Sequence, residues 1–79
     1  MKLEIRTPEK SLFAGEVTSL RARAVDGEIG ILPNHAPLVT MLETGKIKFS
    51  LPTKEEVTIE SGQGFLIVRK NQVNILLRA

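Results

Sequence analysis

The sequence predicts an all-β domain, an antiparallel β-sandwich or flattened barrel of about eight to ten short strands. Three observations support this fold class. Apolar and polar residues alternate with a period of two, and Gly, Pro and Asn separate the alternating segments. No stretch keeps a 3.6-residue period over the length that a stable amphipathic helix needs. With 79 residues, the chain is expected to form one domain over residues 1–79.

The first half of the chain contains two alternating segments before residue 25. Residues 2–6, KLEIR, place Leu3 and Ile5 on one face, and Thr7-Pro8-Glu9 ends the strand. Residues 8–16, PEKSLFAGE, form the only segment in which we expect a helical turn. Residues 17–24, VTSLRARA, repeat the alternation, with the arginines in water and an inner face made of Thr18, Leu20, Ala22 and Ala24.

The chain from residue 28 onward predicts six strands. Residues 28–32 are expected at a sheet edge because Pro33 cannot donate to a central ladder, and residues 38–42 follow a second turn. Residues 46–51, KIKFSL, and 56–60, EVTIE, predict a hairpin with an inner face made of Ile47, Phe49, Leu51, Val57 and Ile59. Residues 65–68, FLIV, are apolar on both faces and predict the most enclosed strand. The last strand, residues 73–77, turns Val73, Ile75 and Leu77 to one side.

Composition excludes several classes of protein. The chain has no cysteine, so it has no disulfide and no thiolate metal site. Its net charge of +2 comes from scattered residues and only 4% of residues are aromatic, so we expect no nucleic-acid partner. The N-terminus lacks the apolar region of a signal peptide, and no apolar stretch reaches the length of a membrane span.

Residues 26–38, DGEIGILPNHAPL, concentrate the residues that most resemble a site. His35 is the only histidine, and no second ligand or nucleophile elbow accompanies it, so we expect neither a metal site nor a catalytic site. A turn or interface residue that hydrogen-bonds locally is the favoured interpretation of His35. Asp26-Gly27 predicts a turn with positive φ. Glu28 is either solvated surface or a handle for a basic or polar partner loop.

Residues 61–65, SGQGF, contain a G-x-G arrangement that could suggest a phosphate site. A strand follows it instead of a helix N-terminus, so the amides that would bind phosphate are missing. We therefore predict a strand-entry turn or bulge at Gly62 and Gly64, and no cofactor.

Four stretches taken together resemble one known family. LFAGEV (12–17), DGEIGILPNHAPLVTML (26–42), Gly45 and SGQGFLIVRKNQVNILL (61–77) are similar to the epsilon subunit of rotary ATP synthases, which is called delta in mitochondria. The resemblance covers essentially the whole chain. It implies a β-sandwich at the foot of the central stalk that binds the gamma subunit and touches the polar loops of the c-ring, as a rotor part and not an enzyme.

The resemblance also implies contact residues. Glu28, Ile29 and Gly30 match the family's loop that faces the c-ring, with Glu28 as the polar contact, and Thr7, His35 and Thr40 align with positions near gamma. Catalytic, cofactor-binding and metal-binding residues are not implied. Membrane association is expected only through the complex, at the cytoplasmic face of the bacterial plasma membrane or the stromal face of the thylakoid.

Typical family members continue into a two-helix C-terminal hairpin, whereas this sequence stops at Ala79. We therefore expect the hairpin, and with it inhibition of ATP hydrolysis and binding of ATP, to be absent. The alternative function is a free-standing β-sandwich that binds a small molecule or carbohydrate, and the low aromatic content argues against it. Co-purification with a gamma-like protein would separate the two.

Overall fold

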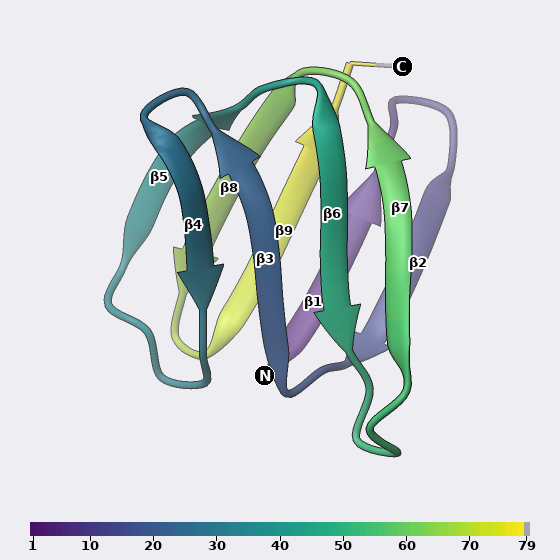
Figure 1. Cartoon of the computed structure of the whole chain (residues 1–79), viewed down its shortest axis with the longest axis vertical. Coiled ribbons are helices and arrows are strands. Elements are labelled where there is room, and N and C mark those ends of the chain that lie inside the picture. The colour runs from purple at the N-terminus through teal and green to yellow at the C-terminus, as the bar shows by residue number, and fades with distance from the viewer. Residues whose placement is uncertain (79) are drawn as a thin grey trace.

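Nine strands make up the computed structural model, which describes residues 1–78 (Figure 1). Within those residues there is no helix, and therefore none that is long and apolar enough to cross a membrane. The predicted domain end, Ala79, lies outside the described residues. The strands are β1 (Lys2–Arg6), β2 (Ser11–Glu16), β3 (Ser19–Ala24), β4 (Gly27–Ile31), β5 (Leu38–Leu42), β6 (Gly45–Ser50), β7 (Glu56–Ser61), β8 (Gly64–Arg69) and β9 (Gln72–Leu77).

The strands form one sheet that folds back on itself into two layers. The first layer has the order β2-β1-β9-β8-β5, and the second has β7-β6-β3, with β4 paired only to β3. The layers join at a corner where Ala24 of β3 pairs with Leu42 of β5. There the Val25 amide donates to the Met41 carbonyl at 3.1 Å and the Glu43 amide to the Arg23 carbonyl at 2.9 Å. This arrangement confirms the predicted β-sandwich, and it confirms β4 as an edge strand.

The prediction of a purely antiparallel sheet is wrong for one pair of strands. β1 and β9 run parallel, from Lys2 opposite Gln72 to Arg6 opposite Leu76 (Figure 1). The remaining strand pairs are antiparallel. Because β1 and β9 come from opposite ends of the chain, no hairpin turn dictates their direction. Their direction follows from how the two-layer sheet brings both ends of the chain together.

The core lies between the inner faces of the two layers. Alternation predicted most of its members, and Phe49 and Ile47 of β6 are among the most deeply buried. Val57, Ile59 and Leu51 are half-buried and pack against this core, as expected. The buried apolar side chains are Met1, Leu3, Ile5, Val17, Leu20, Ala22, Ala24, Ile31, Leu42, Ile47, Phe49, Leu66, Val68, Val73, Ile75 and Leu77.

The helical turn expected within residues 8–16 is wrong, since Ser11–Glu16 forms β2. Phe13 turns inward from this edge strand and packs on Phe49 of the other layer, with 4.4 Å between the ring centroids. Only this large side chain faces the core from β2, so its period-two signal is weak. Thr18, expected on the inner face, precedes β3 and is exposed.

Residues 65–68 are not the most enclosed strand, and that prediction is wrong. Leu66 and Val68 are buried, but Phe65 is 47% exposed. The strand alternates like its neighbours because β8 belongs to an outer layer with protein on one face only. The apolar residues on its outer face therefore meet solvent.

The predicted turn at Gly27 is confirmed, and a second tight turn connects β8 to β9. Gly27 has a φ of 123°, which explains a glycine after Asp26. Lys70 and Asn71 have φ values of 48° and 60° and form the two-residue loop between β8 and β9. Two successive positive φ values are typical of a type I′ turn, which matches the twist of the flanking strands.

Gly64, the first residue of β8, leaves no room for a side chain. A Cβ atom there would collide with the backbone carbonyl oxygen of Leu76 on the neighbouring β9, and would lie 3.0 Å from the Leu77 Cα. Both are backbone atoms of β9, and the β8–β9 ladder holds them in place. This close approach supports the interpretation of residues 61–65 as a strand entry.

The substitution Gly64→Ala is expected to lower the free energy of unfolding by at least about 1–3 kcal/mol, because the added methyl overpacks a fixed backbone. Thermal unfolding followed by circular dichroism would show a melting temperature lower by about 4–8 °C per kcal/mol. Gly30→Ala is the matched control, since a Cβ atom there meets no heavy atom within 4 Å. A Gly64→Ala variant as stable as the Gly30→Ala variant would contradict the steric account.

Candidate docking faces

The two inner faces are used by the core, so any site lies on the outer faces or on the connecting loops. The outer face of the first layer carries five apolar side chains on β5, β8 and β9. Val39, Met41, Phe65 and Leu76 are 69%, 51%, 47% and 45% exposed, and Ile67 is half-buried. We call this set the apolar patch: Val39, Met41, Phe65, Ile67 and Leu76.

Strand register makes the apolar patch continuous. Met41 lies opposite Phe65, and Phe65 lies opposite Leu76, so these three side chains form one row across three strands. Val39 and Ile67 form the next row along the same strands. On the far side of β9 the face becomes polar, with Glu4 and Arg6 of β1 in an ion pair of 3.3 Å. A contiguous apolar surface with a polar rim is typical of a protein-binding face.

The loop between β4 and β5 holds His35 in a defined position. The His35 amide donates to the Leu32 carbonyl at 3.2 Å, and Asn34 has a φ of 64°, which together with Pro33 describes a type II turn. The half-buried imidazole lies with Nδ1 2.7 Å from the Ala36 carbonyl oxygen. A carbonyl only accepts, so Nδ1 carries the hydrogen. The predicted local hydrogen bonding of His35 is confirmed.

A second contact ties this loop to the neighbouring β8–β9 turn. The Asn34 amide donates to the Asn71 side-chain oxygen at 2.8 Å. Asn71 thus forms one turn through its backbone and anchors another through its side chain. The two connections lie at the same end of the sheet and form one supported unit.

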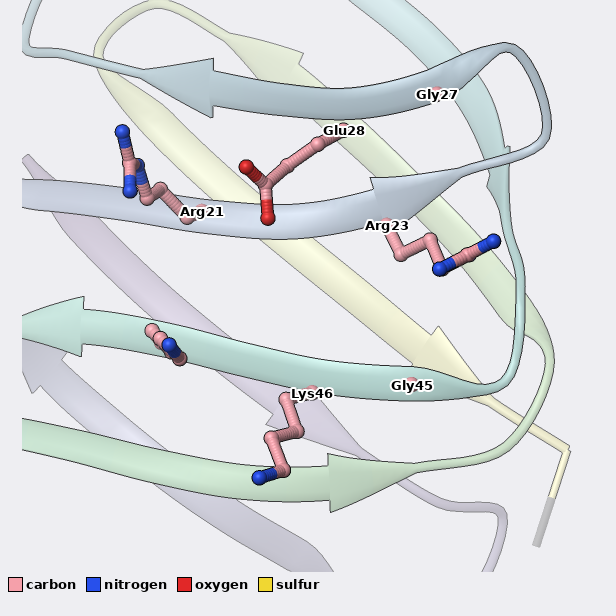
Figure 2. A pocket seen from close by; sticks show the side chains of 7 residues that line it. Arg21, Arg23, Gly27, Glu28, Gly45 and Lys46 are labelled. Carbon is pink, nitrogen blue, oxygen red and sulfur yellow. The ribbon is translucent and has the colours of Figure 1, made fainter.

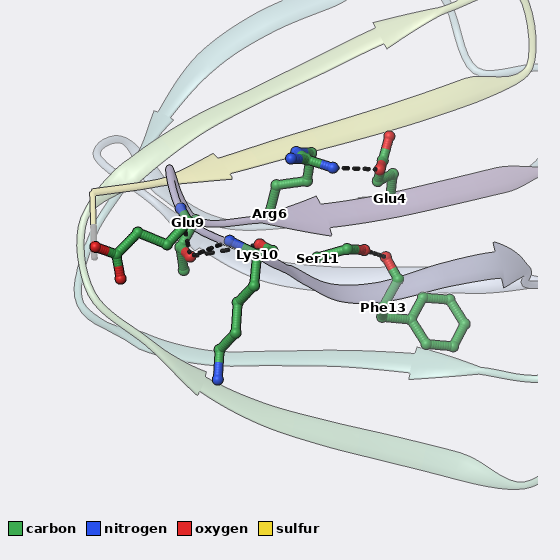
Figure 3. Close-up of polar contacts among 7 residues, drawn as sticks. Glu4, Arg6, Glu9, Lys10, Ser11 and Phe13 are labelled. Carbon is green, nitrogen blue, oxygen red and sulfur yellow. Dashed lines mark hydrogen bonds and ion pairs between the residues drawn. The ribbon is translucent and has the colours of Figure 1, made fainter.

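Thr7 lies in the loop between β1 and β2, and its hydroxyl organises that loop. Figure 3 shows Glu9 and Lys10 of the same loop. The Thr7 hydroxyl oxygen accepts from the Lys10 amide at 3.2 Å and from the Glu9 amide at 3.4 Å, and it lies 3.4 Å from the Lys10 carbonyl oxygen. The Thr7 amide also donates to the Lys10 carbonyl at 2.9 Å. The half-buried Thr7 therefore shapes the turn that follows β1.

The three residues expected near gamma are not brought together. The β1–β2 loop, with Thr7, lies at the upper end of the sheet in Figure 1, and the β4–β5 loop, with His35, lies at the lower end. Thr40 is paired with Leu66, and its half-buried side chain shares the inner side of β5 with Leu38 and Leu42. Each of the three, however, is close in sequence or register to the apolar patch.

Glu28 and Gly30 share the outer face of β4, whereas Ile29 between them packs against the core. Glu28 lies opposite Arg23, and its carboxylate projects over β3 (Figure 2). The three residues expected at the c-ring thus present one exposed acid and one bare glycine to solvent, beside the β3–β4 turn. The acid lies in the lining of an open groove that also contains Arg21, Arg23, Lys46 and Lys48.

Sequence reasoning missed the apolar patch. Its signal was present, since Phe65 and Ile67 alternate with the core residues Leu66 and Val68. A strand with apolar side chains on both faces must either be covered by protein on both faces or expose one apolar face to solvent. Whether β8 is covered on both faces depends on how the sheet folds into two layers, and local periodicity does not reveal that.

Among residues 1–78 no group of three or more His, Asp or Glu side chains could hold a metal ion. His35, the one imidazole, is not joined by a nucleophile within hydrogen-bond distance in the same residues. The apolar patch, the braced loops and the outer face of β4 are therefore the candidate docking faces among the described residues.

Curated relatives match nearly the whole chain. The ATP synthase epsilon chain of Brevibacillus brevis is 41% identical over 76 residues, which cover 96% of this chain and 58% of that protein. The ATP synthase epsilon chain of Chlorobium limicola is 43% identical over 75 residues, which cover 95% of this chain and 85% of that protein. The chain thus spans little more than half the length of the first relative and most of the second.

Solved structures share the fold at low sequence identity. A chain in the Euglena gracilis mitochondrial ATP synthase (OSCP/F1/c-ring) superposes with a TM-score of 0.91 at 22% identity, covering 98% of this chain and 49% of that one. A chain in the central stalk and c-ring structure of the Tetrahymena thermophila mitochondrial ATP synthase has a TM-score of 0.84 at 19% identity, covering 99% and 63%.

The family model agrees with these matches and with the resemblance in the sequence. It extends over residues 1–79, that is, over the two-layer sheet described above. The chain therefore belongs to the family of the ATP synthase delta/epsilon chain beta-sandwich domain.

Proposed function

We propose that this chain is a non-catalytic part of the rotor of a proton-translocating rotary ATP synthase, where it docks the gamma subunit onto the c-ring and helps couple proton flow to ATP synthesis. The single observation that carries the proposal is the apolar patch on the outer face of β5, β8 and β9. Membership of the delta/epsilon family supports gamma and the polar loops of the c-ring as the partners.

The apolar patch is the surface that we assign to gamma. Each of its apolar side chains loses about 25 cal/mol of unfavourable hydration for every Å² that a partner covers. Phe65 lies in the middle of the Met41–Phe65–Leu76 row, where an aromatic anchor contributes most to binding. The polar rim, including Glu4 and Arg6, is suited to orienting the partner.

Two of the predicted gamma contacts, Thr7 and His35, lie in loops next to this patch, and the third, Thr40, lies on the inner side of β5. Thr7 follows Arg6, which lies opposite Leu76, and His35 precedes β5, whose outward side chains begin at Val39. Thr40 lies between Val39 and Met41. A partner that covers the patch diagonally would reach the loops of Thr7 and His35 at its two corners, while Thr40 would influence the fit through the position of β5.

The end of the sheet that carries the β3–β4 turn is the one that we assign to the c-ring. Glu28 is exposed there and offers carboxylate oxygens to the donors of polar loops, and Gly30 allows close approach because its surroundings are open. Ile29 would act by holding β4 on the core. Through these contacts the chain would lie at the membrane periphery, on the cytoplasmic face in bacteria or the stromal face in plastids.

The alternative of a free-standing carbohydrate-binding module receives less support. Sugar recognition uses exposed aromatic faces, whereas Phe49 is buried and Phe13 packs on it. Phe65, the remaining phenylalanine, belongs to a flat apolar row instead of a polar cleft.

The substitution Phe65→Ser is expected to weaken binding to gamma about tenfold or more, since a central aromatic anchor contributes about 2 kcal/mol or more. Isothermal titration of purified gamma with each variant would measure the dissociation constant. Val25→Ser is the matched control, because Val25 has the same exposed fraction of 47% but lies in the β3–β4 turn, outside the patch. Equal affinities of the two variants would reject the assignment of the patch.

The substitution His35→Ala is expected to leave folding nearly intact and to weaken gamma binding. It removes one local hydrogen bond, which contributes about 0.5–1.5 kcal/mol to stability. Thr53→Ala serves as the control, because it also removes one local hydrogen bond, from the β6–β7 loop of the other layer. If recovery in a gamma pull-down is the same for both variants, His35 is not a gamma contact.

The substitution Glu28→Gln is expected to lower retention of the chain on the c-ring about twofold to fivefold, as removal of one exposed charge does. Complexes reassembled with each variant would be assayed for retention and for proton-driven ATP synthesis. Glu60→Gln is the control, an exposed acid on β7 of the same layer. Unchanged retention and synthesis with Glu28→Gln would remove this residue from the c-ring contact.

A further inference from the structure

The outer face of the second layer carries four cationic side chains in a two-by-two array. Arg21 and Arg23 alternate along β3, and Lys46 and Lys48 alternate along the neighbouring β6. Arg21 lies directly opposite Lys48. The stem of Arg23 packs over Gly45, where an added Cβ would lie 3.4 Å from it. These side chains line an open groove of about 490 Å³, which we call the basic groove (Figure 2): Arg21, Arg23, Gly27, Glu28, Gly45, Lys46 and Lys48.

The cations of the basic groove make no ion pair within residues 1–78, although two acids face them across the strands, Glu28 opposite Arg23 and Glu60 opposite Lys46. The ion pairs of residues 1–78 join Met1 to Glu16 and Arg6 to Glu4, and neither involves the groove. Glu28 is the single acid in the lining, so the groove has a net charge of +3. Like charges opposite one another destabilise a sheet. A surface that keeps Arg21 and Lys48 opposed is suited to an anionic partner that relieves this repulsion.

We propose that the basic groove binds an acidic segment of a partner protein in an extended conformation. Alternate residues of a strand repeat every roughly 6.6 Å, and adjacent strands lie about 4.8 Å apart. An extended segment with Asp or Glu at every second position has the same repeat as Arg21–Arg23 and Lys46–Lys48. Carboxylates are matched to guanidinium groups, which bind them through two parallel hydrogen bonds.

Other anions fit the groove less well. The backbone amides of β3 point alternately to its two neighbours and take part in the ladder with β4 and, up to Arg21, in the ladder with β6, so they do not converge on a phosphate. Phe49 lies on the inner side of β6, so no ring of that strand offers a stacking surface for a base. An extended carboxylate-bearing chain needs neither feature.

This inference is independent of the assignment of the apolar patch to gamma, because the basic groove and the apolar patch lie on opposite layers of the sandwich, but it shares Glu28 with the c-ring assignment. A partner on one face leaves the other accessible. Glu28 links the two proposals with opposite signs, since its removal should weaken a c-ring contact and strengthen the binding of an acidic segment in the groove.

The test uses the full chain and a fluorescent ten-residue peptide with Glu alternating with Ser, with its Gln counterpart as the control probe. Fluorescence anisotropy at about 50 mM salt, where the Debye length exceeds 10 Å, would measure binding. The double variant Arg21→Gln/Lys48→Gln is expected to bind the Glu peptide about tenfold more weakly or worse. The control Lys2→Gln/Lys10→Gln removes the same charge from exposed positions outside the groove and should bind like the parent.

Two further results complete the test. Glu28→Gln is expected to tighten binding of the Glu peptide about twofold to fivefold, because it removes the competing carboxylate. Equal binding of the Glu and Gln peptides, or equal losses in the two double variants, would overturn the proposal. Tighter binding of a single-stranded oligothymidylate, or of vesicles with 30% phosphatidylglycerol, than of the Glu peptide would likewise overturn it.

Discussion

Packing of one layer's inner face against the other determines the rest of this structure. The chain has no cysteine, and residues 1–78 hold only two ion pairs, one at the surface and one between the buried N-terminal ammonium of Met1 and the exposed Glu16, so burial of apolar side chains is the main stabilising term. Side chains alternate along each strand, so every residue buried in the core sends its neighbours to the opposite face. The core therefore selects which side chains the two outer faces present.

Those two outer faces have opposite chemistry. One presents the apolar patch around Phe65, and the other presents the basic groove around Arg21 and Lys48. A thin two-layer sheet keeps the faces apart while sharing one core, so each can contact a different partner without competing for space. This arrangement suits a component that holds two larger parts in a fixed relation and carries out no reaction itself.

The loops at the two ends of the sheet are braced by their own hydrogen bonds. Thr7 organises the β1–β2 loop, and Asn71 supports the turn that holds His35. Because backbone and side-chain contacts define both loops, a partner binding there would lose little conformational entropy in ordering them. Rigid loops on a rigid sheet are also what transmission of position between two partners requires.

Local patterns in the sequence determined most strands, the turns at Gly27 and Gly64, and the core residues of β6, because alternation and turn chemistry act between near neighbours in the chain. Tertiary structure alone decided the strand at Ser11–Glu16, through Phe13 on Phe49, and the parallel pairing of β1 with β9. It also decided that Met41, Phe65 and Leu76 form one exposed row and that Arg21 meets Lys48. Each of these depends on residues far apart in the chain, whose approach is set by the folding of the sheet at its corner and not by any local period.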